Sequence, residues 1–305
     1  MELGEIFDTG FRIWKENIRV GLLFIASNLL SIAVIIISLL AAMYVIGFDV
    51  IELMLSGGSE RELFNYVVNT LPAVIAIVFV GFLLSFVVYE FFNLAAIKAC
   101  SLAIDGRMDL GNAIKYARRK LLTMIFAEIL RLIIVFSPFL LVLAAFIHPS
   151  LGGFIFSAVA FFVLFILFLI LLVYTPYAVA EGYGATESIV ASFHVARNRL
   201  GETLVILIVA ILIHAACNMV GQMFSYISSL NLNAYPYTYP YSNSPPPDLM
   251  PVLAVAGVSY LISILFSSFI ARPLESLFFL LSFRDATGKT SGDSEEDSET
   301  SNGTA

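Results

Sequence analysis

Long apolar stretches separated by short polar segments make up most of this chain. A bilayer's hydrocarbon core is about 30 Å thick, so a helix that crosses it needs about 20 residues at 1.5 Å each. The apolar stretches reach this length. They predict an all-α fold, a polytopic membrane helix bundle of six transmembrane helices at about 20–46, 71–92, 121–147, 152–175, 203–226 and 252–271.

The composition excludes a soluble globular enzyme. Of the 305 residues, 60% are hydrophobic and only 13% are charged, whereas soluble domains carry about 25% charged residues. The sequence also lacks a P-loop, a His-Glu-x-x-His zinc motif and a Gly-x-Ser-x-Gly nucleophile motif. We therefore expect no enzymatic activity, no cofactor and no metal site.

Basic residues lie almost entirely beside one end of the predicted helices, and this asymmetry predicts the orientation. Basic residues near membrane-spanning helices are retained on the cytoplasmic side. Only Arg61 falls on the opposite side. The sequence thus predicts a cell-membrane protein with both termini in the cytoplasm, where the flanking basic residues are Arg12, Lys15, Arg19, Lys98, Arg107, Lys115, Arg118, Arg119, Lys120, Arg197, Arg199, Arg272, Arg284 and Lys289.

Two segments differ in composition from the membrane body at 1–284. Residues 285–305 are rich in Gly, Ser, Thr and acidic residues and contain no aromatic residue, which predicts a disordered acidic tail. With that tail set aside the body is close to neutral, so its charge implies no nucleic-acid partner. Residues 235–247 contain five prolines and four tyrosines. They are interpreted as an external spacer with interfacial tyrosines, or as a loop that binds an external partner.

A short segment precedes each odd-numbered predicted helix, and the three segments align as an internal repeat. In the first and third segments Glu5 matches Glu187, Gly10-Phe11-Arg12-Ile13 matches Ser192-Phe193-His194-Val195, and Lys15 matches Arg197. The middle copy, Leu110–Arg119, shares the Leu-Gly start of the first and its apolar positions.

The apolar spacing of each copy is that of an amphipathic helix. We expect three interfacial elbow helices, with apolar faces toward acyl chains and basic residues toward lipid phosphates. They act either as simple anchors or as the walls of a pocket for a headgroup. The expected headgroup contacts are Arg12, Lys15, Arg118, Arg119, Lys120, Arg197 and Arg199.

The stretch Tyr174–Ser192 carries a resemblance to a known family. It has a proline near the end of a predicted helix, a Glu-Gly-x-Gly turn and a serine-bearing amphipathic helix. It resembles six-span prokaryotic membrane proteins of unknown function, related to the membrane domain of glycerophosphoryl diester phosphodiesterase. The opening Leu3–Asn17 is similar to archaeal members. The resemblance implies fold, membrane location and a lean toward lipid or envelope biology; the fused phosphodiesterase domain and its metal ligands have no counterpart in this chain.

Ionisable groups inside the predicted helices are candidates for function because hydrocarbon disfavours them. Glu128 and Arg131 lie three residues apart on one helix face, so we expect an ion pair that locks packing or, alternatively, a proton or substrate relay. Pro138 is expected to kink the same helix. His214 is expected to bond Glu128 or Asn28, which would place Glu128, Arg131, His214, Asn218 and Asn28 in one polar network.

Two functional hypotheses follow. The first is a non-enzymatic membrane protein that organises or senses the bilayer through contacts with membrane lipids. The alternative is a transporter or channel with a polar path past Glu128, Arg131 and His214. The repeats all begin on the same side, unlike those of inverted-repeat carriers, so transport ranks second.

Overall fold

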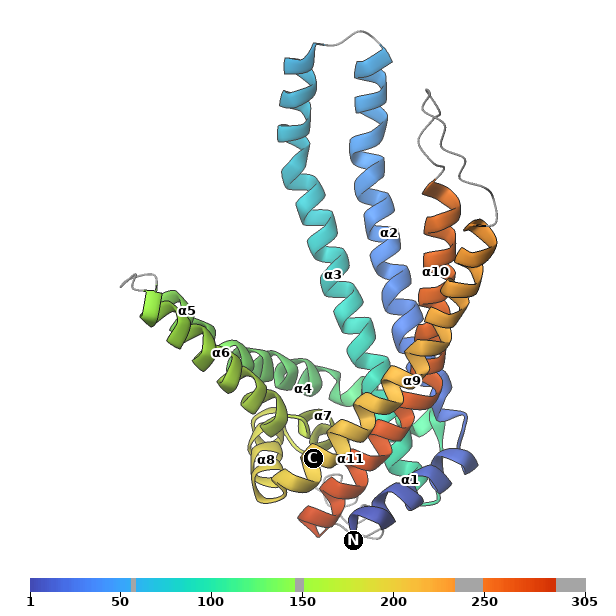
Figure 1. Ribbon diagram of the computed structural model, residues 1–305, viewed down its shortest axis with the longest axis vertical. Helices are drawn as coiled ribbons and strands as arrows, with labels where there is room; N and C mark the ends of the chain where they lie inside the picture. Colours follow the sequence, from blue (N-terminus) through green and yellow to red (C-terminus); the bar gives the residue numbers. More distant parts are fainter. Residues whose placement is uncertain (56–58, 146–150, 234–248, 289–305) are drawn as a thin grey trace, which may run out of the picture. The chain divides into compact units, whose positions relative to one another are not determined.

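A computed structural model describes residues 1–55, 59–145, 151–233 and 249–288. No strand occurs in these ranges. Residues 235–247 and most of the expected acidic tail, 289–305, lie outside them. The helices, of which Figure 1 labels α1 to α11, are α1 (Leu3–Glu16), α2 (Val20–Leu55), α3 (Glu60–Ile104), α4 (Leu110–Phe136), α5 (Phe139–Ala145), α6 (Leu151–Leu171), α7 (Thr175–Ala180), α8 (Ala185–Asn198), α9 (Leu200–Asn233), α10 (Leu249–Phe266), the π-helical η1 (Ser267–Ala271) and α11 (Arg272–Thr287).

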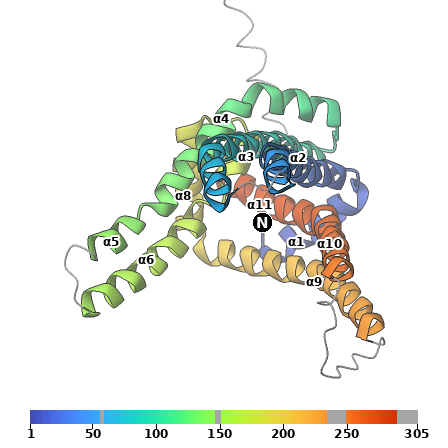
Figure 2. The same cartoon turned by 90° about the horizontal axis from the view of Figure 1, so that it is seen from above.

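The chain divides into two compact units. One is Ala26–Asn93, most of the α2–α3 hairpin. Serine hydroxyls bring its helices together: Ser85 donates to the carbonyl of Ser31 (2.9 Å), and Ser27 donates to the carbonyl of Tyr89 (3.0 Å). The other unit is Met1–Ile25 together with the chain from Leu94 onward. In Figures 1 and 2, this second unit holds the hairpins α5–α6 and α9–α10.

Within the described residues, five helical segments are long and apolar enough to cross a membrane, by length and composition. They are Val20–Gly47, Phe64–Ile104, Ile155–Ala180, Leu200–Ile227 and Ala254–Thr287. Each overlaps one of the six predicted helices, so the coarse prediction of an all-helical protein with several membrane-capable helices is confirmed.

The remaining predicted span, 121–147, is not one long apolar helix among the described residues. It is divided between α4 and α5 by a turn at Ser137 and Pro138, as the proline predicts. Ser137 donates its hydroxyl hydrogen to the carbonyl of Ile134 (2.7 Å), the group that Pro138 leaves without its helical donor.

Two helices run well beyond the predicted boundaries. Phe64–Ile104 has 41 residues and Ala254–Thr287 has 34, or about 60 and 50 Å at 1.5 Å per residue, against a hydrocarbon core of about 30 Å. Both helices therefore continue beyond the predicted membrane spans, past residues 92 and 271. Hydropathy falls there, but protein burial keeps the backbone helical, and η1 continues directly into α11 up to Thr287.

The buried core of the larger unit is formed by three helical segments: residues 94–104 at the end of α3, the short helix α7, and helix α11. We call this region the base. Aromatic residues fill it. The ring of Phe279 lies edge-on to Tyr174 (centroids 5.4 Å apart) and stacks on Tyr177 (5.3 Å). Small residues such as Ala95 and Ala99 of α3 are fully buried. The base is thus packed like the interior of a soluble protein.

Helices α1 and α8 confirm the predicted match between the first and third repeats. Each has 14 residues. The Glu5 carboxylate accepts from the backbone N–H of Glu2 (2.9 Å), and the Glu187 carboxylate accepts from that of Gly184 (2.9 Å). Both helices end on a residue with φ near −123° and ψ of 41°. The two copies therefore begin and end in the same way.

The prediction of a separate elbow helix is wrong for the middle copy. Asp109 caps the helix that begins at Leu110, and this helix continues without a break to Phe136. Between Lys115 and Leu132 the sequence contains no Gly, Pro or Asn, so strong helix formers carry the helix through. Helix α1 ends instead at Asn17, whose side chain bonds the carbonyl of Ile13 (3.0 Å).

Three glycines with positive φ mark the ends of the three repeats. Gly106 follows α3 (φ 68°), Gly182 follows α7 (φ 101°) and Gly288 follows α11 (φ 68°). Glycine adopts this left-handed conformation without the steric cost that a Cβ adds. Each repeat thus closes with the same kind of turn.

The end of one repeat packs on the first helix of the next. Helix α7 packs on α8, and α11 packs on α1 to close the cycle. Ile6 and Ile13 of α1 are buried, and Gly10 lies against the ring of Phe278. The expected contact between the apolar face of α1 and acyl chains is therefore wrong for these residues, because α11 occupies that face.

Close approach of α9 and α10 yields a first prediction. A methyl group on Gly221 would collide with the backbone carbonyl of Ser259, whereas a methyl group on Gly201 of the same helix meets nothing within 4 Å. We expect Gly221→Ala to cost about 1–3 kcal/mol and to lower Tm in detergent. Gly201→Ala should leave Tm unchanged or raise it. Equal Tm values for the two variants would contradict this packing.

Candidate functional site

A buried arginine joins the three repeats at the base. The guanidinium of Arg284 donates to Asp105 (Nη1 to Oδ1, 2.6 Å), to Glu181 (Nε to Oε1, 2.9 Å) and to the Ser101 hydroxyl (Nη2 to Oγ, 2.9 Å). Arg284 is only 8% exposed. Asp105 directly precedes Gly106, and Glu181 directly precedes Gly182. The terminal turns of the first two repeats therefore supply the carboxylates that the third repeat neutralises.

Lys98 brings a second cation beside this cluster. Its ammonium group donates to the carbonyl of Ala180 (3.1 Å) and to Ser101 Oγ (3.3 Å), and it lies over the ring of Tyr116 (4.8 Å to the centroid). The Tyr116 hydroxyl donates to the carbonyl of Val179 (2.6 Å). Burial raises the pKa of Tyr116, and the charge of Glu181 adds to the effect. The phenol therefore stays protonated and able to donate.

A second polar cluster joins α9 to α11. The Arg199 guanidinium donates to Asp285 and, at 3.4 Å, to Glu202. Ser282 donates to Glu202 and also lies 2.9 Å from the Tyr174 hydroxyl. The hydrogen bond to Asp285 raises the pKa of Arg199. Arg199, an expected headgroup contact, is thus used within the protein.

The remaining expected headgroup contacts form two groups, one half-buried and bonded within the protein and the other exposed. Lys120 is half-buried and donates to the carbonyl of Gly182 (3.2 Å). In contrast, the exposed basic residues make no ion pair or hydrogen bond in the part of the chain that the structure describes: Arg12, Lys15, Arg118, Arg119 and Arg197.

The pattern of buried and exposed positions supports the alignment of the middle copy with the first and third. Ile6, Ala113 and Ser188 occupy one buried position of the alignment, and Gly10, Ala117 and Ser192 occupy the next. At three other positions every side chain is exposed. We call these sets the exposed triads: Phe11, Arg12 and Lys15; Arg118, Arg119 and Leu122; Phe193, His194 and Arg197.

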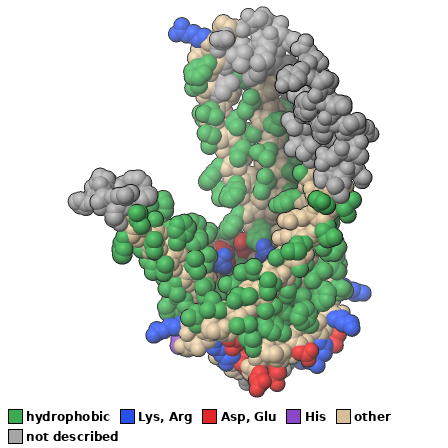
Figure 3. Space-filling model, viewed as in Figure 1, with side chains coloured by type: hydrophobic (Ala, Val, Ile, Leu, Met, Phe, Trp, Pro, Cys, Tyr) green, Lys and Arg blue, Asp and Glu red, His purple; other side chains and the backbone are tan. Residues whose placement is uncertain are grey.

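Each exposed triad combines one large apolar side chain with two basic-type side chains. The apolar members are Phe11, Leu122 and Phe193, which are 45%, 69% and 40% exposed. On the face drawn in Figure 3, charged side chains gather around α1, α8 and α11, whereas hydrophobic side chains cover α6 and α9. An exposed apolar group beside two bases suits the boundary between headgroups and acyl chains.

His214 has partners other than the expected ones. Its Nδ1 lies 2.8 Å from Ser267 Oγ, and its Nε2 lies 2.9 Å from Glu275 Oε2. Both ring nitrogens are therefore occupied, and the expected bond from His214 to Glu128 is not formed. These contacts tie α9 to η1 and α11. The π-helical turn also leaves the carbonyl of Phe269 to accept from the indole N–H of Trp14 (3.3 Å).

The other members of the expected polar network have contacts of their own. Asn218 accepts a long hydrogen bond (3.4 Å) at its carbonyl from Ser263. Asn28 belongs to the other compact unit. Cys100 and Cys217 are buried thiols. Within the described ranges, no group of three or more His, Cys, Asp or Glu residues is arranged to hold a metal ion.

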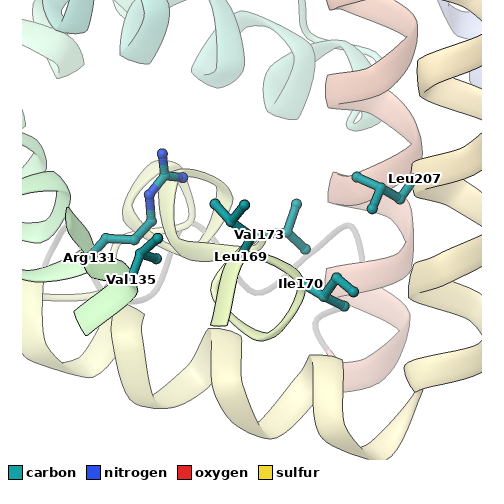
Figure 4. Close-up of a pocket in the computed structure, with 6 residues that line it drawn as sticks. All are labelled: Arg131, Val135, Leu169, Ile170, Val173 and Leu207. Carbon is teal, nitrogen blue, oxygen red and sulfur yellow. The ribbon is translucent and has the colours of Figure 1, made fainter. Parts of the chain in front are cut away.

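The predicted ion pair between Glu128 and Arg131 is confirmed, with Nη2 and Oε2 2.9 Å apart. The Glu128 side chain is 7% exposed and that of Arg131 is 31% exposed. Arg131 and Val135 form part of a pocket of about 250 Å³ with Leu169, Ile170, Val173 and Leu207. Figure 4 shows the guanidinium extending away from α4 beside these aliphatic side chains. The pair thus has a buried acidic end and an accessible basic end.

Comparison with known proteins gives one match. A family model described as a domain of unknown function (DUF7847) matches residues 62–274, which is more than half of the chain. No curated protein and no solved structure matches the chain.

Sequence reasoning missed the partners of Arg284, although one signal was present. Asp105-Gly106 and Glu181-Gly182 each join an acidic residue to a glycine at the end of an apolar helix. Such acidic-Gly pairs mark equivalent turns, and their comparison would have placed the two carboxylates at one level of the bundle.

The Arg284 cluster generates a second prediction. Arg284→Gln leaves Asp105 and Glu181 buried without their cation, which costs about 3–5 kcal/mol in comparable cases. We expect a large drop in Tm, measured in detergent.

Two further variants control this prediction. Arg118→Gln removes the same charge from an exposed position and should change stability by no more than about 0.5 kcal/mol. Arg284→Met combined with Asp105→Asn and Glu181→Gln should recover part of the loss, since no buried charge is then left unpaired. If Arg284→Gln melts at the same temperature as Arg118→Gln, the cluster does not hold the base together.

Proposed function

The chain belongs to the DUF7847 family, and from that premise we propose that it is a non-enzymatic, multi-pass membrane protein that binds anionic lipid headgroups. The exposed triads make the contacts. In this proposal the protein organises or senses the bilayer around it, and its partners are membrane lipids.

The composition and repetition of the exposed triads carry the proposal. A large apolar side chain enters the acyl boundary, and two neighbouring basic groups meet phosphates. Each base near an anionic membrane surface contributes about 1 kcal/mol. The same exposed positions carry this chemistry in all three repeats although the residue order differs, as in Phe11 compared with Arg118.

The use of basic residues elsewhere supports the same conclusion. Lys98, Lys120, Arg199 and Arg284 all donate to protein oxygens. Of the triad bases, His194 lies with its Nε2 2.9 Å from Asn198 Nδ2. The Arg and Lys members make no ion pair or hydrogen bond within the described residues, so their natural partners are anions outside the protein. Lipid phosphates supply these anions at the cytoplasmic surface of a cell membrane.

The proposed topology places the base, α1 and α8 on the cytoplasmic side of the membrane, with both chain termini on that side. The basic residues that flank the apolar helices support this orientation. Six crossings, with α4 and α5 forming the third, complete the proposal. The relation to the membrane domain of glycerophosphoryl diester phosphodiesterase, drawn from Tyr174–Ser192, belongs to it as well.

Transport is the weaker alternative. A polar path past Glu128, Arg131 and His214 would need these groups to share a hydrated route. Glu128 pairs with Arg131, and His214 bonds Ser267 and Glu275. The three residues therefore form two separate sets of contacts. The pair Glu128 and Arg131 lies along one helix, and His214 joins α9 to η1 and α11.

The third prediction concerns the exposed triads. The variant Arg12→Gln, Arg119→Gln and Arg197→Gln removes one base from each triad. We expect the preference of the protein for spin-labelled phosphatidylglycerol over phosphatidylcholine to fall, measured as the motionally restricted fraction by electron paramagnetic resonance in reconstituted vesicles. The wild-type preference should also weaken with added salt.

A matched control separates local contact from net charge. Arg61→Gln removes one exposed base outside the triads and should leave the lipid preference unchanged, whereas Arg119→Gln alone should reduce it. A triple variant that keeps the wild-type preference would refute the proposed function.

The fourth prediction distinguishes lipid contact from transport. Cys217 is 6% exposed and lies three residues from His214. In a Cys100→Ser background, a membrane-impermeant maleimide should fail to label Cys217 from either side of sealed vesicles, and denaturation should restore labelling. Labelling of the native protein from either side would indicate water beside His214 and would favour transport.

A further inference from the structure

The pocket beside Arg131 combines one cationic side chain with an aliphatic lining. Three segments build it: Arg131 and Val135 lie on α4, Leu169 and Ile170 on α6 with Val173 just after it, and Leu207 on α9 (Figure 4). Apart from the arginine, every lining residue is aliphatic. A volume of about 250 Å³ admits part of an acyl chain but not a whole lipid.

Arg131 gives this apolar pocket one charged end. Its guanidinium has five N–H donors, and within the described residues its ion pair is the one with Glu128. The Glu128 carboxylate is turned into the protein, at 7% exposed, while the guanidinium is 31% exposed. An incoming ligand therefore meets the cation and not the anion.

The surroundings strengthen the attraction for an anion. The other residues that line the pocket are aliphatic, and charges interact more strongly where the effective dielectric constant is low. The planar donor fork of arginine matches the paired oxygens of a phosphate. An arginine within an apolar segment also draws headgroups and water toward itself, which reduces its own cost.

We propose that this pocket binds one anionic phospholipid. The phosphate contacts the free edge of the Arg131 guanidinium, and part of one acyl chain lies against Val135, Leu169, Val173 and Leu207. This site differs from the exposed triads, because its residues do not overlap with theirs and it holds a single lipid between helices. A negative result at the exposed triads therefore does not count against this site, and a negative result at this site does not count against the triads.

The site also explains why the pair Glu128 and Arg131 has one buried and one exposed member. A pair that only locked helix packing would have no need of an accessible guanidinium above an aliphatic pocket. In the proposed site Glu128 fixes the rotamer of Arg131, and the remaining donors of the guanidinium are directed at the lipid phosphate. Glu128 is a positioning residue in this arrangement.

Native mass spectrometry of the delipidated, full-length protein tests the proposal. The probes are phosphatidylglycerol, phosphatidylcholine and oleate, each added separately. We expect one retained phosphatidylglycerol per chain, bound roughly tenfold more tightly than phosphatidylcholine because only the former has a net negative headgroup. Adding the probes over a concentration series gives the dissociation constants.

Two leucines on α6 form a matched pair for the pocket walls. Leu169 lines the pocket and Leu167 does not, yet they are similarly exposed, at 44% and 39%. Leu169→Trp should fill the pocket and abolish the retained lipid, and Leu167→Trp should leave it bound. The variant Glu128→Gln with Arg131→Gln removes the charge without leaving a buried carboxylate unpaired, and it should remove the preference for phosphatidylglycerol.

Other outcomes overturn the proposal. If both tryptophan variants retain the lipid as the wild type does, the pocket is not the site. If the double glutamine variant keeps the preference, Arg131 does not contact the headgroup. Retention of oleate in place of phosphatidylglycerol, with the same sensitivity to the variants, would replace phosphate by carboxylate as the ligand. The triad variant should leave the retained lipid in place, so a failure of the proposed function remains separate from a failure of this site.

Discussion

The ion cluster around Arg284 is the constraint on which the larger unit depends. A buried guanidinium is tolerated only when it is paired and hydrogen-bonded, and Arg284 finds its partners 103 and 179 residues away, in Glu181 and Asp105. The ends of α3, α7 and α11 must therefore meet at one point. Once they meet, the aromatic rings of α11 fill the space between them. The packing of the base therefore results from the need to pair the buried charge of Arg284.

This constraint also explains the cyclic order of the repeats. Each repeat ends in a glycine turn at the base, and α7 and α11 each rest on the first helix of the following repeat. Because α11 covers Ile6 and Ile13 of α1, the first and last parts of the chain stabilise one another. The faces of α1, α4 and α8 turned away from the base are those that carry the exposed triads.

The sequence predicted well what depends on neighbours along the chain. Hydropathy located five membrane-capable helices, Pro138 located a break, and the spacing of Glu128 and Arg131 predicted their ion pair, because each feature is decided within a few residues. It also matched Glu5 with Glu187, since helix capping is local.

What the sequence did not predict depends on contacts between distant segments. The partner of His214 is Glu275, 61 residues away, and no periodicity connects them. The continuous helix through the middle repeat was missed for another reason: the alignment favoured an elbow, while the helix propensity of the residues after Arg119 favoured continuation, and propensity prevailed. Hydropathy likewise did not predict that the helices continue past residues 92 and 271, because it does not register burial by protein.

The basic residues of this chain fall into two groups, those neutralised by carboxylates of the protein and those without such a partner among the described residues. This difference links the fold to the proposed function. Within the base a carboxylate from another repeat neutralises the guanidinium, as Asp105 does for Arg284, and the result is rigid packing. At the exposed triads no carboxylate of the described residues forms an ion pair. Charges left at an apolar boundary without a protein partner are costly unless an anion is supplied from outside, and a membrane supplies phosphate at that level. In the proposed function a lipid phosphate neutralises Arg119 as Asp105 neutralises Arg284.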